Sequence, residues 1–204
     1  MIKELSTQFS SIAASNPASE ASKASIWTRR AGVALAGSAL VAVCAHVALP
    51  LNFTPVPLTL GPLAVLFLGL LLRPRLAAAT LTAYLAEGAM GLPVFAPGPI
   101  AFSGLAHLVG PTGGYLLAYP FAVALISFLW RSTGRGFSTA LAAAAIGNLA
   151  ILACGALWLG FLTHASVAMA FNLGVLPFLP GDALKIAAAA ALATGCQRLR
   201  RNAR

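Results

Sequence analysis

The chain is dominated by apolar runs that are too long and too continuous for the surface of a soluble domain. One run reads ALAAAAIGNLAILACGALWLGFL and another FAVALISFLW, and neither contains a charged residue. Of the 204 residues, 59% are hydrophobic and 8% are charged, whereas a soluble domain carries about 25% charged residues. Barrel strands would alternate apolar and polar residues instead. The sequence therefore predicts an all-α integral membrane protein.

Six transmembrane helices can be placed in this pattern, each approaching the roughly 20 residues that cross a hydrocarbon layer. The second is short. They are expected at about 31–49, 58–72, 76–92, 112–130, 138–162 and 180–197. Residues 1–28 are polar and Ser/Ala-rich, and they lack the apolar segment and cleavage site of a signal peptide. We expect a disordered or loosely helical cytoplasmic extension over 1–28 and a six-helix membrane domain over 29–204.

The basic residues predict the orientation of these six spans. Twelve of the thirteen Lys and Arg residues precede the first span, follow the sixth, or lie in the connections after the second and fourth. All twelve share one side of the membrane if there are six spans, and the positive-inside rule makes that side, with both termini, cytoplasmic. The net charge of +9 thus reflects topology. It does not indicate nucleic-acid binding, because no basic stripe interleaves with aromatic residues.

Several polar side chains are predicted to lie at membrane depth. With a rise of 1.5 Å per residue, Glu87, Tyr115, Asn148 and Lys185 fall about 18–24 Å from the nearest cytoplasmic basic residue. A charge near the bilayer centre costs roughly 2.5–3.5 kcal/mol, so a lone charge facing lipid is hard to tolerate. Asp182 and Lys185 are spaced i, i+3 and can pair on one helix face.

The interpretation of these polar residues has two branches. The Asp182–Lys185 pair indicates a polar socket for a small ligand that enters from outside, and the alternative is a structural salt bridge between helices. For Glu87 the two readings are balanced. For Asn148, a hydrogen bond that joins helices is as reasonable as a ligand contact.

The segment GPTGGY opens the fourth predicted span. No Lys follows the glycines, so it is not a Walker A loop. Gly113 and Gly114 allow a ligand to approach the backbone, and Tyr115 offers a flat ring with a polar tip. The alternative is that the glycines only mark the start of the helix. Tyr84 and Thr54 complete the set of candidate ligand-binding residues.

Small residues recur every fourth position on the first span, at Ala34, Ser38 and Ala42. Such rows let two helices approach closely in lipid. The row predicts an interface with a membrane partner, and internal packing is the alternative.

Motifs for enzyme chemistry are missing from the sequence. It has no nucleotide-binding loop, no GxSxG and no HExxH, and its three cysteines lie singly in apolar runs. His46, His107 and His164 share no metal-ligand spacing and are expected as solvated residues near the outer surface. We therefore predict a protein that is not an enzyme and that has no metal or cofactor.

Four segments together resemble the BioY family, the biotin-binding S components of energy-coupling factor (ECF) transporters. They read FTPVPLTLGPLAVLFLGLLL, GLPVFA, GPTGGYLLAYPFA and GVLPFLPGDALK, and the likeness covers about residues 30–197. The combination of FTPVP, GPTGGY and LPGDxxK is specific, and the family's characteristic Asp and Lys fall on Asp182 and Lys185.

The resemblance implies an S-component-like fold that captures biotin in a bacterial cytoplasmic (inner) membrane. In such transporters a coupling transmembrane subunit and two ATPases supply the energy, and some members are thought to work without them. In that reading Asp182 accepts from the ureido group, and Lys185 meets either the ureido oxygen or the carboxylate. Two alternatives stay open: an S component for another vitamin, and a carrier in which Glu87 and Asp182 move protons.

Overall fold

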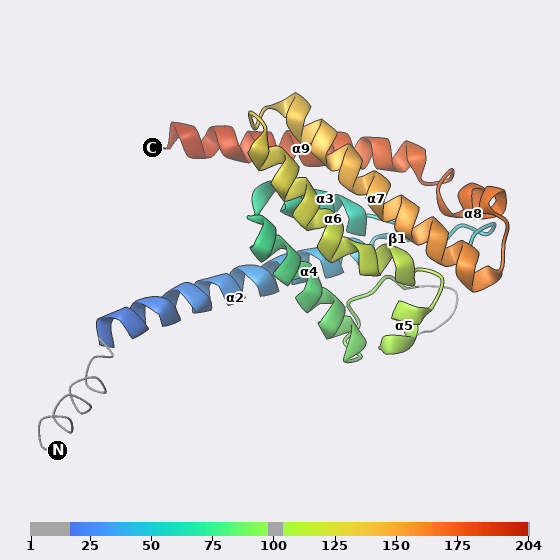
Figure 1. The fold of residues 1–204 in the computed structure, drawn as a ribbon, viewed down its shortest axis with the longest axis horizontal. Helices are drawn as coiled ribbons and strands as arrows, with labels where there is room; N and C mark the ends of the chain where they lie inside the picture. Colours follow the sequence, from blue (N-terminus) through green and yellow to red (C-terminus); the bar gives the residue numbers. More distant parts are fainter. Residues whose placement is uncertain (1–16, 98–103, 204) are drawn as a thin grey trace, which may run out of the picture. The chain divides into compact units, whose positions relative to one another are not determined.

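The computed structural model describes residues 17–97 and 104–203 and is mostly helical (Figure 1). Two strands of two residues form a small antiparallel hairpin, in which Ala48 pairs with Thr59. In chain order the elements are α2 (Pro17–His46), β1 (Ala48–Leu49), β2 (Leu58–Thr59), α3 (Gly61–Leu71), α4 (Pro74–Ala89), α5 (Leu105–Val109), α6 (Gly113–Ser132), α7 (Phe137–Thr163), α8 (Val167–Gly174) and α9 (Leu179–Asn202).

The chain divides into two units, residues 1–33 and residues 34–204, and helix α2 belongs to both. In the first unit, the guanidinium of Arg30 lies 5.6 Å from the ring centre of Trp27. Helix α2 begins at Pro17, inside the segment predicted as a polar extension, and residues 1–16 lie outside the described residues. The predicted division after residue 28 stays a prediction.

Helix α6 organises the second unit by packing against α3, α4 and α7, while α9 packs against α3 and α7. Ile126 of α6 is fully buried where two glycines let neighbouring backbones come close. A Cβ on Gly69 of α3 would lie 2.9 Å from Ile126 Cβ, and one on Gly147 of α7 would lie 2.2 Å from its Cγ1. Glycine at these two positions therefore sets the spacing of α3, α6 and α7.

The second half of α2 uses its small residues for internal packing. A Cβ on Gly37 would lie 2.6 Å from Thr80 Cγ2 of α4. Ser38 is fully buried and donates a hydrogen bond to Glu87 Oε2. Ser38 is therefore not on the surface that a partner would meet, contrary to the expectation for the row. Ala34 and Ala42 are half-buried, so for these two the partner interface stays a prediction.

Within residues 17–97 and 104–203, three helices are long and apolar enough to cross a membrane: Ala24–His46, Gly113–Ser132 and Phe137–Thr163. Helices α8 and α9, bent by 54° at their junction, make a fourth if they form one broken span. Helix α3 has 11 residues and α4 has 16, or roughly 16 and 24 Å of length. Each of the six predicted spans overlaps one of the helices α2, α3, α4, α6, α7 and α9, but six crossings stay a prediction.

The end of α7 shows why the fifth predicted span does not continue into the following apolar residues. His164 adopts a left-handed conformation with φ 52°, and its N–H donates to the carbonyl of Gly160. This geometry terminates the helix. Ser166 then caps α8 by accepting a hydrogen bond from the N–H of Met169.

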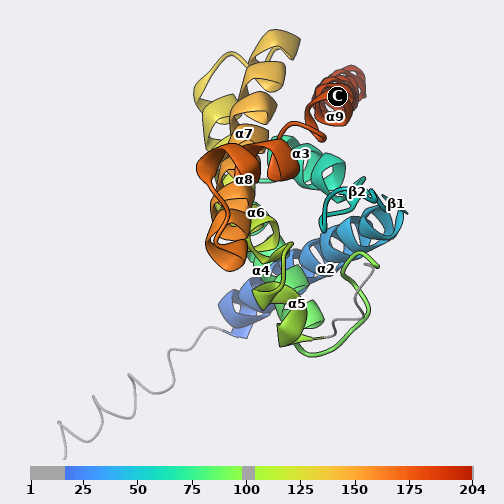
Figure 2. The same ribbon diagram turned by 90° about the vertical axis from the view of Figure 1, so that its right-hand side faces the viewer.

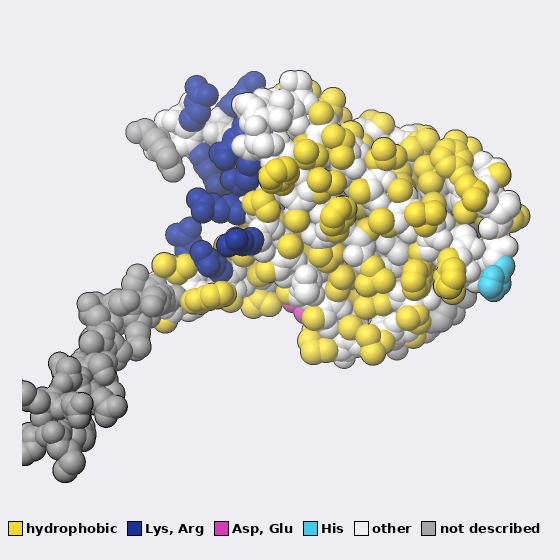
Figure 3. Space-filling model, viewed as in Figure 1, with side chains coloured by type: hydrophobic (Ala, Val, Ile, Leu, Met, Phe, Trp, Pro, Cys, Tyr) yellow, Lys and Arg dark blue, Asp and Glu magenta, His cyan; other side chains and the backbone are white. Residues whose placement is uncertain are grey.

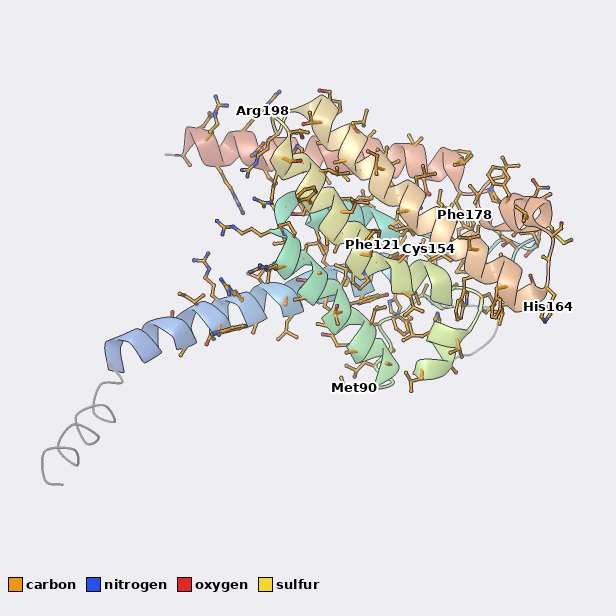
Figure 4. The ribbon with its side chains drawn as sticks, viewed as in Figure 1. Met90, Phe121, Cys154, His164, Phe178 and Arg198 are labelled. Atoms are coloured by element: carbon orange, nitrogen blue, oxygen red, sulfur yellow. The ribbon has the colours of Figure 1, made fainter. Side chains whose placement is uncertain are left out.

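Within the second unit, the short helices α5 and α8 and the hairpin lie at one end of the bundle (Figures 1 and 2). His164 and Phe178 mark this end, and Arg198 marks the opposite one (Figure 4). Arginines in or just after the last turns of α3, α6 and α9 gather at that opposite end, while hydrophobic side chains cover the body between (Figure 3). The end that carries α5, α8 and the hairpin is called the capped end below.

Candidate ligand-binding site

A cavity near the capped end brings together residues from α4, α6, α7, α9 and the hairpin region. It has a volume of about 70 Å³, within about 630 Å³ of empty space that includes its open mouth. Much of the wall is apolar, with Val56, Pro57, Ile151, Leu152 and Phe178 among its residues. Its polar members include Tyr84, Tyr115, Tyr119, Asn148, Asp182 and Lys185. A mostly apolar wall with a few converging polar groups is typical of a small-molecule site.

The charged pair of α9 lies in this wall. Lys185 Nζ donates to Asp182 Oδ1 at 2.9 Å, and both residues are buried, at 6% and 4% exposure. Asp182 stands in the first turn of α9, where backbone N–H groups and the helix dipole stabilise a negative charge. The predicted pairing is confirmed, and it explains how two charges are tolerated in an apolar helix.

Asn148 of α7 extends the pair into a cluster of three residues. Its Nδ2 donates to Asp182 Oδ2 at 2.9 Å. Among the described residues, its Oδ1 is a buried side-chain acceptor that receives no hydrogen bond. Such an atom costs roughly 1–3 kcal/mol when it stays unsatisfied. In a cavity wall, it indicates a site ready to accept an N–H group of a ligand.

Two predicted tyrosines line the cavity with their rings and use their hydroxyls elsewhere. Tyr115 donates to the carbonyl of Gly174 in α8 at 2.6 Å, and Tyr84 donates to the carbonyl of Val94 at 3.1 Å. Gly155 makes room for the Tyr115 ring, because a Cβ there would lie 2.2 Å from it. Both tyrosines therefore offer the cavity a flat apolar surface in a fixed position.

Four predicted ligand contacts do not line the cavity: Glu87, Thr54, Gly113 and Gly114. Glu87 accepts from Ser38, and Thr54 donates to the carbonyl of Leu173 in α8 at 2.9 Å. A Cβ on Gly113 would lie 1.9 Å from Leu108 O, and one on Gly114 would lie 2.2 Å from Trp158 Cβ. The two glycines therefore allow close packing of protein against protein, and the ligand contact that the sequence predicts for them stays a prediction.

Several cavity residues were missed from the sequence. Tyr119 follows Tyr115 by one helical turn on the same face of α6, a spacing that could have identified it. No described residue forms a hydrogen bond with its hydroxyl. His107 was expected in solvent, but it is buried at 8% exposure, lines the cavity and lies 5.0 Å from the Phe95 ring. Nothing in its local sequence distinguishes it from the exposed His46 and His164.

Comparison with known proteins gives a consistent answer. The family model described as "BioY family" matches residues 14–202. The "Probable biotin transporter BioY" of Pyrococcus horikoshii is 40% identical over 160 residues, which cover 78% of this chain and 90% of the relative. The "Biotin transporter BioY" of Thermotoga maritima is 35% identical over 163 residues, which cover 79% of this chain and 92% of the relative.

A solved structure extends the likeness to the fold. The crystal structure of "the S-component for biotin from an ECF-type ABC transporter" superposes with a TM-score of 0.76 at 26% identity, covering 87% of this chain and 93% of the other. The match to the family model spans residues 14–202 and so includes the cavity residues of α6, α7 and α9. This chain belongs to the BioY family.

Proposed function

We propose that the protein binds biotin in the cavity of the capped end and serves its uptake across the cytoplasmic membrane as an S component. The observation that carries this proposal is the buried cluster of Asp182, Lys185 and Asn148 in a mostly apolar wall, with Asn148 Oδ1 unsatisfied. The names of the relatives supply the identity of the ligand, and the cluster supplies a chemical reason for it.

The groups of biotin match those of the cavity. Its ureido group has two N–H donors and one carbonyl oxygen, its rings are otherwise apolar, and its side chain ends in a carboxylate. Asn148 Oδ1 and the remaining lone pairs of Asp182 accept N–H groups. Lys185 keeps N–H donors beyond the one directed at Asp182. The rings of Tyr84, Tyr115 and Phe178 suit the apolar part.

Lys185 has two possible partners on biotin, the ureido oxygen and the carboxylate. A biotin amide keeps the ureido group but lacks the carboxylate. Equal losses of affinity for biotin and its amide in Lys185→Met place Lys185 at the ureido group. A loss confined to biotin places it at the carboxylate.

Binding requires the cavity to widen. Pockets for small ligands usually measure about 300–1,000 Å³. The cavity volume here is about 70 Å³, although the space that includes the mouth reaches about 630 Å³. The elements at the capped end are short: α8 has 8 residues and each strand of the hairpin has two. We propose that these elements move outward to admit biotin, because the long helices behind them are held by their buried core.

We further propose six spans with both termini in the cytoplasm of a bacterial cell. The gathering of arginines at the end opposite the cavity supports this orientation through the positive-inside rule. The cavity then opens toward the outside. In the ECF context named for the solved neighbour, a coupling transmembrane subunit and two ATPases would drive release. Ala34 and Ala42 remain the proposed contact with such a partner.

The test of the function is a binding measurement on the purified full-length chain. Calorimetric titration is expected to show one biotin per chain, and mass spectrometry is expected to find biotin copurified from rich medium. A different vitamin in the purified protein, or no heat with biotin, contradicts the assignment.

A coupled-uptake assay on Ala34→Leu tests the partner separately: biotin binding is expected to persist while uptake falls. Unchanged uptake contradicts the interface.

A further inference from the structure

A second cavity lies at the arginine-rich end, away from the site described above. Its volume is about 590 Å³, within about 1330 Å³ of empty space that includes its mouth. Five arginines from three separate parts of the chain line it. Arg73 precedes α4, Arg131 and Arg135 stand at the end of α6 and in the turn after it, and Arg200 and Arg201 belong to the last turn of α9.

No acidic side chain of this unit neutralises these arginines. Residues 34–204 contain two acidic residues, Glu87 and Asp182. Glu87 accepts from Ser38, and Asp182 is paired with Lys185 in the other cavity. Five like charges around one space repel each other, and the guanidinium group stays protonated at any physiological pH. The cavity is therefore built to attract an anion.

One of the five arginines is held in place by the helices. Arg131 donates through Nε to Leu72 O at 3.3 Å and to Ser127 Oγ at 3.2 Å, and through Nη2 to Leu71 O at 3.3 Å. Ser127 itself donates to Leu72 O at 2.6 Å. These bonds fix the guanidinium across the last turn of α3 and leave other N–H groups to face the cavity.

Apart from Gln197, the rest of the wall carries no polar amide or charge, and it includes Leu70, Leu71, Trp130 and Ala193. Trp130 is buried at 4% exposure and anchored by a hydrogen bond from Nε1 to Gly136 O at 3.3 Å. The cavity lies where α6 and α9 end, and α6 is long and apolar enough to cross the membrane. Arginines above an apolar wall at a membrane boundary suit an amphiphile with an anionic head.

We propose that this cavity binds the phosphate headgroup of an anionic phospholipid in the leaflet on the arginine side. Arginine presents its N–H groups as a planar fork that matches phosphate oxygens in pairs. Leu71, which is half-buried in the wall, contacts the first part of the acyl chains. The bound lipid neutralises the arginines and joins the ends of α3, α6 and α9. This site is independent of what the capped-end cavity binds.

The test uses the delipidated full-length chain in detergent and native mass spectrometry. Phosphatidylglycerol is compared with phosphatidylcholine of the same acyl chains, and glycerol phosphate serves as the headgroup without a tail. The cavity variant is Arg135→Gln with Arg200→Gln. The matched control is Arg75→Gln with Arg198→Gln, which removes the same charge from two arginines outside the cavity wall. All four side chains are exposed, so both variants are expected to fold.

The expected result is preferential binding of phosphatidylglycerol by the parent and the control. The cavity variant is expected to bind it about 25-fold more weakly, because each basic residue contributes about a factor of five. Arg200→Gln with Arg201→Gln replaces the cavity variant if changing Arg135 lowers stability.

Three outcomes overturn the proposal. Equal losses in the cavity and control variants mean diffuse attraction to surface charge. Glycerol phosphate that binds as tightly as the lipid means a site for soluble phosphate. Unchanged lipid binding in the cavity variant together with impaired coupled uptake means that the arginines meet an acidic partner protein instead.

Discussion

Asn148 on α7 and Asp182 on α9 are joined by a hydrogen bond of 2.9 Å from Nδ2 to Oδ2, while the amide oxygen Oδ1 of Asn148 receives no hydrogen bond from any described residue. Lys185 donates to Oδ1 of the same carboxylate. Asp182 therefore joins α9 to α7 through Asn148 and also forms the ion pair with Lys185 in the cavity wall. The cluster thus has both a structural and a binding role. Mutations must separate the two.

Asp182→Asn and Lys185→Met are expected to weaken biotin binding roughly ten- to hundredfold, the value of one charge-assisted hydrogen bond of about 1.5–3 kcal/mol. Asn keeps the volume and one acceptor oxygen, and Met keeps most of the lysine stem. Removing one partner also leaves the other buried charge without its partner, so the stability of the fold is expected to fall as well. Calorimetry is therefore restricted to variants that elute as one folded peak. If both folded variants bind biotin like the parent, the pair is only a structural bridge.

Asn148→Leu removes the unsatisfied acceptor at nearly constant volume. We expect biotin affinity to fall roughly 5- to 150-fold, because an N–H of the ligand then lacks its acceptor at a cost of about 1–3 kcal/mol. The matched control is Asn172→Leu on α8, where the side chain is exposed and outside the cavity wall. Titration of both variants checks the prediction, and equal affinities for the two contradict it.

Thr54→Val and Tyr115→Phe test how the cap is held. Both residues donate to neighbouring carbonyls in the last turn of α8, at Leu173 and Gly174. Each change removes the bond to α8, worth about 0.5–1.5 kcal/mol, and keeps the shape of the side chain. Thr54→Val also removes the longer bond that Thr54 Oγ1 accepts from the N–H of Val56 at 3.4 Å. Biotin dissociation is expected to become roughly 2- to 12-fold faster in each variant, measured by exchange of labelled biotin. Unchanged dissociation rates would show that α8 does not hold biotin in.

The sequence predicted the parts of the site that follow from local spacing. Asp182 and Lys185 are one turn apart, so their pairing could be derived before the helix was seen. Asn148 required the depth argument, which placed it level with the pair without showing the hydrogen bond. The sequence did not show that Thr54 lies outside the cavity wall, and it wrongly placed His107 in solvent, because both positions depend on how connections fold over the helix ends.

The fold shows the same limit. Six apolar segments predicted six helices, but α8 was not predicted because it continues an apolar run. The break before it depends on a left-handed residue, His164, that has no glycine to signal it. The small-residue row on α2 could not be assigned to an internal or external neighbour, because both use the same residue types.

Gly114→Ala tests the role of the GPTGGY segment. The new Cβ would lie 2.2 Å from Trp158 Cβ and 2.8 Å from Cys154 O, so α6 and α7 must move apart. We expect a loss of about 1–3 kcal/mol of stability, measured as a lower unfolding temperature in detergent. The control is Gly195→Ala in α9, where nothing lies within 4 Å and alanine favours the helix. A stable Gly114→Ala variant that fails to bind biotin would instead support direct contact with the ligand.

The orientation of the chain can be tested with two single cysteines. Cys44, Cys154 and Cys196 are first replaced by alanine, and His164→Cys or Asn202→Cys is then introduced. Both positions are exposed; His164 marks the capped end, and Asn202 ends α9 at the arginine-rich end. Because the arginine-rich end is expected in the cytoplasm, a membrane-impermeant thiol reagent should label His164→Cys in intact cells. It should label Asn202→Cys only after the membrane is opened.

Labelling of Asn202→Cys in intact cells, or of both positions from one side, contradicts an even number of spans with cytoplasmic ends. It would also move the arginine cavity to the outer leaflet.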